Sequence, residues 1–95
     1  MATERVRSAS REIGTVLAIT PAGAVTVRAP SSEIAPEGTY VSEPRTRFQG
    51  RVLRVYGPVS RPYLSVRPRR PLTAEQGLDL LGRSLLRDTT GRSDR

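Results

Sequence analysis

Residues 48–68 (FQGRVLRVYGPVSRPYLSVRP) constrain the fold of this 95-residue chain more than any other segment. Two strand-like runs are joined there by residues 57–63 (GPVSRPY). Pro58 and Pro62 each hold φ at about −65° and lack a backbone donor, and Gly57 can adopt a positive φ that other residues avoid. A loop that only joins two strands does not need these restrictions. We therefore expect a rigid corner on which something docks, bracketed by Val55, Tyr56, Val59 and Tyr63.

Short strands are predicted along most of the chain. Residues 20–23 (TPAG) are typical of a turn, so the runs on either side of them are expected to pair as a hairpin. Alternation places Leu64 and Val66 toward the core and Tyr63 on the outer surface. The predicted strands are residues 14–19, 24–29, 38–42, 48–56, 63–68 and 82–87.

The strand over residues 48–56 is irregular. Val52 and Val55 would lie on opposite faces of a regular strand. One extra residue in a bulge would place both side chains inside, and bulges are common where the strands of small barrels bend. We therefore predict a bulge between these two valines.

The pattern changes after Pro68. Thr73 and Gln76 have the spacing of a capping box, which predicts a helix over about residues 74–81. Gly82 argues against a longer helix, and the chain is expected to return to the sheet as a strand. Leu78, Leu81 and Leu85 follow at near-helical spacing. The whole group over residues 78–86 is expected in the core: Leu78, Leu80, Leu81, Leu85 and Leu86.

These elements predict an all-β fold, a small closed barrel of five or six strands with a short C-terminal helix. The barrel domain is expected over residues 12–87. The polar segments outside it are expected to be a flexible leader, residues 1–11, and a disordered tail, residues 88–95.

Composition argues against catalysis. The chain has no cysteine and no histidine, which removes the thiolate nucleophile, the commonest general base and the commonest zinc ligands. Its nine acidic residues form no recognisable pair, and Ser60 and Ser65 have no His or Lys to activate them. We expect a protein that is not an enzyme and needs neither cofactor nor metal. No apolar run suits a membrane span, so the protein is expected to be soluble and intracellular.

The net charge of +7 favours an acidic partner or nucleic acid. All sixteen basic residues are arginine, a bias that also fits a GC-rich coding sequence. Four arginines are possible secondary contacts, with acidic protein residues or with RNA phosphates, although a solvated edge explains them equally well: Arg61, Arg67, Arg69 and Arg70.

The corner and its flanking strands resemble the Gar-type small subunit of H/ACA ribonucleoproteins. That family has G-x-V, a hydrophobic run, G-P-V, two variable residues, and then P-Y before a strand. This chain carries the pattern in register as Gly50, Val52, Val55, Tyr56, Gly57, Pro58, Val59, Pro62 and Tyr63. The predicted first hairpin and residues 82–86 are also similar to the family, so the resemblance covers about residues 12–87.

The resemblance implies a six-stranded barrel, similar to a domain of translation factors, that is not an enzyme. Such a subunit binds the dyskerin-type pseudouridine synthase directly and supports RNA-guided pseudouridylation in rRNA processing and ribosome biogenesis. It does so by helping the thumb loop of the synthase to load and release substrate. Contact with the guide RNA and the other small subunits is indirect. The implied interface residues are Tyr56, Gly57, Pro58, Val59, Pro62 and Tyr63.

The chain departs from the family pattern in two ways. It carries no long Gly-Arg-rich tail, so it looks like the compact archaeal form, which is cytoplasmic, rather than the nucleolar eukaryotic one. Arg54 stands where an acidic residue is common. Two other interpretations remain open: a basic small-barrel RNA-binding protein, and the related Naf-type H/ACA assembly factor. A PRC-type barrel is a more distant alternative that does not explain Pro62-Tyr63.

Overall fold

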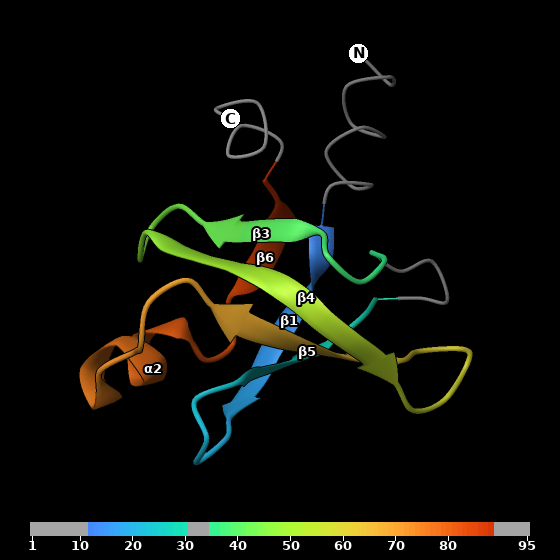
Figure 1. Cartoon of the computed structure of the whole chain (residues 1–95), viewed down its shortest axis with the longest axis horizontal. Helices are drawn as coiled ribbons and strands as arrows, with labels where there is room; N and C mark the ends of the chain where they lie inside the picture. Colours follow the sequence, from blue (N-terminus) through green and yellow to red (C-terminus); the bar gives the residue numbers. More distant parts are fainter. Residues whose placement is uncertain (1–11, 31–34, 89–95) are drawn as a thin grey trace.

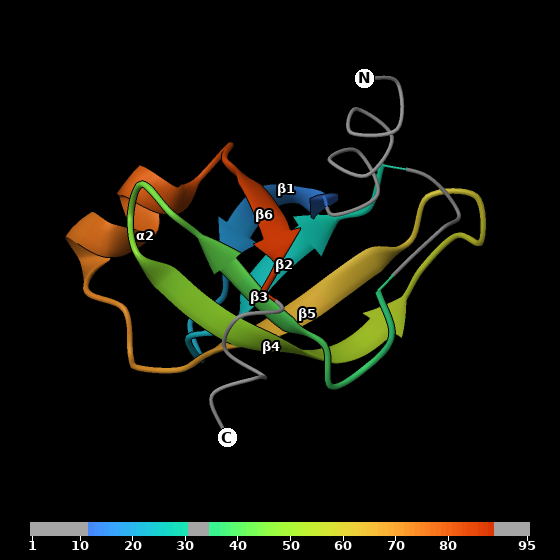
Figure 2. The ribbon, with the colours of Figure 1, turned by 90° about the horizontal axis from the view of Figure 1, so that it is seen from above.

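Six antiparallel strands close into a barrel in the computed structural model, which describes residues 12–30 and 35–88 (Figures 1 and 2). The strand order around the barrel is β1-β2-β5-β4-β3-β6, and one short helix precedes the last strand. The predicted all-β barrel is thereby confirmed. The elements are β1 Glu12–Ile19, β2 Val25–Arg28, β3 Tyr40–Glu43, β4 Phe48–Tyr56, β5 Tyr63–Pro68, α2 Ala74–Leu80 and β6 Ser84–Arg87.

Three parts of the chain lie outside the described residues. They are the predicted leader over residues 1–11, residues 31–34 of the connection between β2 and β3, and residues 89–95 of the predicted tail.

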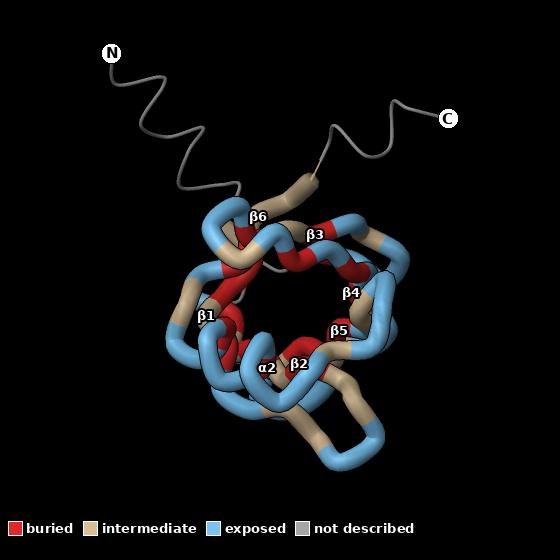
Figure 3. Tube along the Cα trace, turned by 90° about the vertical axis from the view of Figure 1, so that its left-hand side faces the viewer, coloured by how far each residue is buried: buried red, intermediate tan, exposed pale blue. Residues whose placement is uncertain are grey.

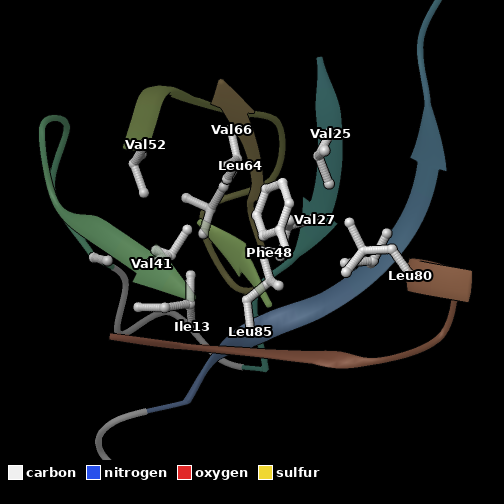
Figure 4. Close-up of a cluster of buried hydrophobic side chains, with 12 residues drawn as sticks. Ile13, Val25, Val27, Val41, Phe48, Val52, Leu64, Val66, Leu80 and Leu85 are labelled. Carbon is white, nitrogen blue, oxygen red and sulfur yellow. The ribbon is translucent and has the colours of Figure 1, made fainter. Parts of the chain in front are cut away.

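The core fills the interior of the barrel with side chains that alternate along the strands. Every strand contributes buried residues (Figure 3). Leu64 and Val66 of β5 are fully buried, as the alternation predicts. Figure 4 shows how side chains from the strands and from α2 converge in one cluster. Its members are Ile13, Val16, Val25, Val27, Ala35, Val41, Phe48, Val52, Leu64, Val66, Leu80 and Leu85.

The predicted bulge in β4 is present. The register between β4 and β5 shifts between Val52 and Arg54, so one extra residue enters β4. Val52 is buried and Val55 is partly buried against the core, which a regular strand would not allow. Further shifts occur in β1, between Glu12 and Gly14 and between Val16 and Ala18. Such bulges bend strands, and bending is what a small closed barrel requires.

The predicted capping box begins α2. The Thr73 hydroxyl accepts from the backbone N–H of Gln76 (3.1 Å), and the Gln76 side chain accepts from the backbone N–H of Thr73 (2.9 Å). The helix ends at Leu80, one residue earlier than predicted, with Leu81 as its C-cap. Residues 82–87, predicted to return to the sheet, contain β6, which pairs with both β1 and β3 and closes the barrel.

Two leucines predicted in the core are exposed. Leu78 has an exposed fraction of 71%, and Leu81 is also exposed. Leu80 is fully buried as predicted, because α2 lies against β1 on the side that carries Gly77 and Leu80. The near-helical spacing of Leu78, Leu81 and Leu85 does not define one face of a helix, because α2 ends at Leu80, between Leu78 and the other two. Leu85 is buried as predicted, and Leu86 is partly buried.

A buried carboxylate organises the turn between β3 and β4. Glu43 has an exposed fraction of 6%, and one of its oxygens accepts from the backbone N–H and the hydroxyl of Thr46, both at 2.8 Å. β3, which ends at Glu43, begins at Tyr40 and not at residue 38 as predicted, because Gly38 adopts a φ of 89° in the preceding turn. Burial raises the pKa of Glu43, but the hydrogen bonds from Thr46 and Arg45 and the charge of Arg83 outweigh it, so the pKa lies below its ordinary value.

Glu43→Gln should lower the free energy of unfolding at pH 7 by about 1 kcal/mol, since charge-assisted hydrogen bonds become neutral ones. Because the pKa is lower in the folded protein, ionised Glu43 stabilises the fold above about pH 4.3. That contribution is lost as the pH falls through the folded pKa. Urea unfolding of both proteins between pH 7 and pH 3 measures this. The variant should lose less stability on acidification, and an equal loss would contradict the assigned role of Glu43.

Candidate functional site: a rigid corner between β4 and β5

Residues 57–62 join β4 to β5 and form the corner. Gly57 has a φ of 91°, which side-chain-bearing residues rarely adopt. A Cβ at this position would also lie 2.7 Å from Cδ2 of Tyr63, too close for any real contact. Two independent constraints therefore require glycine here. The shape of the turn accounts for Gly57 without any contact to a partner.

The corner is also tied to the end of β2. The backbone N–H of Ala29 donates to the carbonyl of Pro62 at 2.9 Å. Nε of Arg61 donates to the carbonyl of Ala29 at 3.4 Å. Both bonds cross between segments that are far apart in the sequence, so the corner is held from outside as well as by its own prolines.

Three side chains on neighbouring strands form what we call the tyrosine stack: Arg28 on β2, Tyr63 on β5 and Tyr56 on β4. The pairing places Tyr63 opposite both of the others. The two rings are stacked, with centroids 5.6 Å apart and planes 25° from parallel. Cζ of Arg28 lies 4.5 Å from the Tyr63 ring centroid, and Nη1 of Arg28 donates to the Tyr63 hydroxyl at 2.7 Å. The stack fixes the side of the corner that faces away from the core.

The implied interface residues divide into a surface group and a supporting group. Val59, at the tip, has an exposed fraction of 86%, and Tyr56 and Pro58 are exposed as well. Pro62 is buried, and Tyr63 is half-buried as the middle member of the stack. Tyr63 does point outward, but much of its ring is already occupied within the protein. The surface available to a partner is therefore centred on Val59.

The four possible secondary contacts do not lie together. Arg61 belongs to the corner, whereas Arg67, Arg69 and Arg70 lie toward the other end of the β4–β5 hairpin (Figure 1). Arg67 comes four positions after Tyr63, which is about 13 Å along a strand. A partner that covers only the corner would leave these three arginines uncovered.

Sequence reasoning missed Arg28 as part of this site. No motif near Arg28 in the sequence indicates a contact with Tyr63, because that contact follows from the β2–β5 register. Its Nε is buried and has no hydrogen-bond partner. The signal that was available is the alternation of β2, which places Arg28 on the outer face with Thr26.

The acidic side chains and the helix of the described residues limit two kinds of site. Over residues 12–30 and 35–88, no three acidic side chains gather closely enough to hold a metal ion. In the same part of the chain, no helix has the length and apolar character needed to cross a membrane. The corner itself can present a fixed apolar and aromatic surface to another molecule.

Comparison with protein-family models gives no match, and no curated protein matches the chain. The resemblance to the Gar-type subunit therefore stays a prediction based on the residues quoted above.

Gly57→Ala should lower the free energy of unfolding by about 1–3 kcal/mol for the backbone strain alone, with a further loss from the contact with Tyr63. Gly23→Ala is a matched control, since Gly23 has a φ of 93° and a Cβ there would meet nothing within 4 Å. Thermal or urea unfolding of both variants separates the two effects. Equal destabilisation would mean that the approach of Tyr63 to Gly57 does not matter.

Proposed function

We propose that this chain is a non-catalytic docking subunit whose corner binds a protein partner, the dyskerin-type pseudouridine synthase. The observation that carries the proposal is the position of Val59. It is the most exposed large apolar side chain of the described residues, and it stands at the tip of a corner fixed by Gly57, by two prolines and by hydrogen bonds to Ala29.

Rigidity favours binding because association costs conformational freedom. A loop that is ordered before binding loses little more on docking, so more of the contact energy appears as affinity. The corner has this property through residues within it and through the tyrosine stack beside it. An exposed apolar residue on a mobile loop would not offer the same advantage.

The composition of the corner indicates what the partner surface should look like. Val59 and Pro58 suit a shallow apolar recess, and the exposed ring of Tyr56 suits its wall, since aromatic residues are enriched among those that dominate interface energy. Arg61 stands beside them and suits an acidic rim. The catalytic domain of a synthase with such a recess is the partner we propose.

The role in RNA-guided pseudouridylation follows from the resemblance and depends on it. In this proposal the barrel docks on the synthase and helps its thumb loop to load and release substrate RNA. The guide RNA and the remaining small subunits meet the barrel through the synthase. The chain supplies shape and charge, and the synthase supplies the chemistry.

Val59→Asp should weaken binding to the synthase about tenfold or more, which is about 1.4 kcal/mol, because the carboxylate would be desolvated in the recess. Leu78→Asp is the matched control, since Leu78 is also exposed but lies on α2, across the molecule from the corner (Figures 1 and 2). Size-exclusion co-elution without RNA, followed by titration calorimetry, measures both. Val59 is preferable to Tyr63 because removal of Tyr63 would also dismantle the stack.

Neither variant should change the melting temperature of the isolated barrel by more than a degree or two, because both side chains are exposed. Binding that is unaffected by Val59→Asp, or reduced equally by Leu78→Asp, would contradict docking through the corner. A complete lack of association between the wild-type chain and the synthase would contradict the proposed function as a whole.

A further inference from the structure

Five arginines line two shallow grooves that meet on the outer surface of the barrel. One groove is lined by Arg47, Arg69 and Arg70, and the other by Arg51, Arg67 and Arg69. Gln49 and Arg69 line both grooves, so the two form one continuous surface. We call this surface the arginine strip and define it by Arg47, Arg51, Arg67, Arg69 and Arg70.

The pairing of β4 with β5 places like charges directly opposite each other. Arg51 on β4 faces Arg67 on β5 in register, an arrangement that destabilises a sheet. The ion pair between Arg83 and Asp79 in the described residues involves no member of the strip. Asp88 is the one acidic residue that lines either groove. The fold therefore concentrates positive charge here that its own described residues do not balance.

Hydrogen bonds hold one member of the strip in place. The backbone N–H of Arg69 donates to the carbonyl of Gln49 at 2.8 Å, and Nη1 of Arg69 donates to Oε1 of Gln49 at 2.8 Å. Arg51 lies against the ring of Tyr40, with its Cζ 5.2 Å from the ring centroid. These contacts are with a neutral amide and a ring, so the guanidinium charges remain available to an anion.

The two grooves carry little of the exposed apolar surface of the barrel. Among the large hydrophobic side chains that are exposed in the described residues, Tyr40 alone lines the grooves. The centres of protein–protein interfaces are depleted of charged residues, whereas five arginines and Asp88 line this surface. Nucleic-acid interfaces combine a positive groove with an aromatic platform, which the strip and Tyr40 together provide.

We propose that the arginine strip binds the phosphodiester backbone of a single nucleic acid strand, without reading its sequence. Planar guanidinium groups bind phosphate oxygens in pairs, and arginines spread along a groove can follow successive phosphates. The exposed ring of Tyr40 offers a surface on which one base can stack. This inference is independent of docking through the corner, because the strip lies at the other end of the β4–β5 hairpin.

The test is fluorescence anisotropy of the full chain with a labelled twelve-nucleotide RNA, with DNA of the same sequence, and with a polyglutamate peptide, each from 50 to 400 mM salt. The strip variant is Arg51→Gln, Arg67→Gln and Arg69→Gln combined. The charge-matched control is Arg45→Gln, Arg54→Gln and Arg87→Gln combined, since these three arginines line neither groove. Thermal unfolding of both variants verifies that the barrel is intact.

We expect the strip variant to bind RNA at least tenfold more weakly, with the slope of log K against log salt shallower by about 2, since each phosphate contact on a single strand contributes about 0.7. The control should retain most of its affinity. Binding to RNA and DNA alike, or to RNA alone, supports the proposal and distinguishes the two sources of the phosphate backbone.

Three results would overturn the proposal. They are an equal loss in both variants, an unchanged affinity in the strip variant, and preferential binding of polyglutamate. If the triple variant does not fold, the single variant Arg67→Gln tests the proposal instead. No hydrogen bond or ring contact in the described residues involves the Arg67 side chain, and its removal relieves the repulsion with Arg51. The Arg67→Gln variant should have a melting temperature no lower than that of the wild type. Its slope of log K against log salt for RNA binding should still be shallower by about 0.7.

Discussion

The antiparallel pairing of β4 with β5 is the constraint on which the other features depend. Its register places Tyr56 beside Tyr63 at one end of the hairpin and Arg51 beside Arg67 toward the other. The bulge after Val52 lets the same strand pack Val55 against the core and still reach the corner with Tyr56 exposed. A regular β4 would turn one of these side chains to the wrong face, because side chains alternate along a strand.

Features set by local chemistry could be predicted from the sequence. Thr73 and Gln76 predicted the helix start because a capping box needs only residues that are near neighbours in the chain. Val52 and Val55 predicted the bulge because the spacing of two apolar residues conflicts with strand alternation. The rigidity of the corner followed from Gly57 and its prolines in the same way.

Features set by contacts across the sheet could not be predicted. The contact of Arg28 with Tyr63 requires the register between β2 and β5, which no local pattern specifies. Leu78 and Leu81 were wrongly expected in the core because their spacing assumes a helix that continues past Leu80. Three members of the arginine strip, Arg67, Arg69 and Arg70, were named from the sequence as possible contacts. Their union with Arg47 and Arg51 could not be predicted, since the five come from β4, β5 and two connections that only the folded sheet brings together.

Closure of the barrel by β6 has a consequence for how the protein reaches its native state. β6 pairs with β1 at the start of the described chain, and Ser84 donates to the carboxylate of Glu12. These are the most widely separated contacts in the barrel, and such contacts form slowly because a long loop must close first. During synthesis the edges of β1 and β3 stay unpaired until almost the whole barrel sequence has emerged. Unpaired edges attract other strands, so the nascent barrel is exposed to mispairing until β6 has emerged.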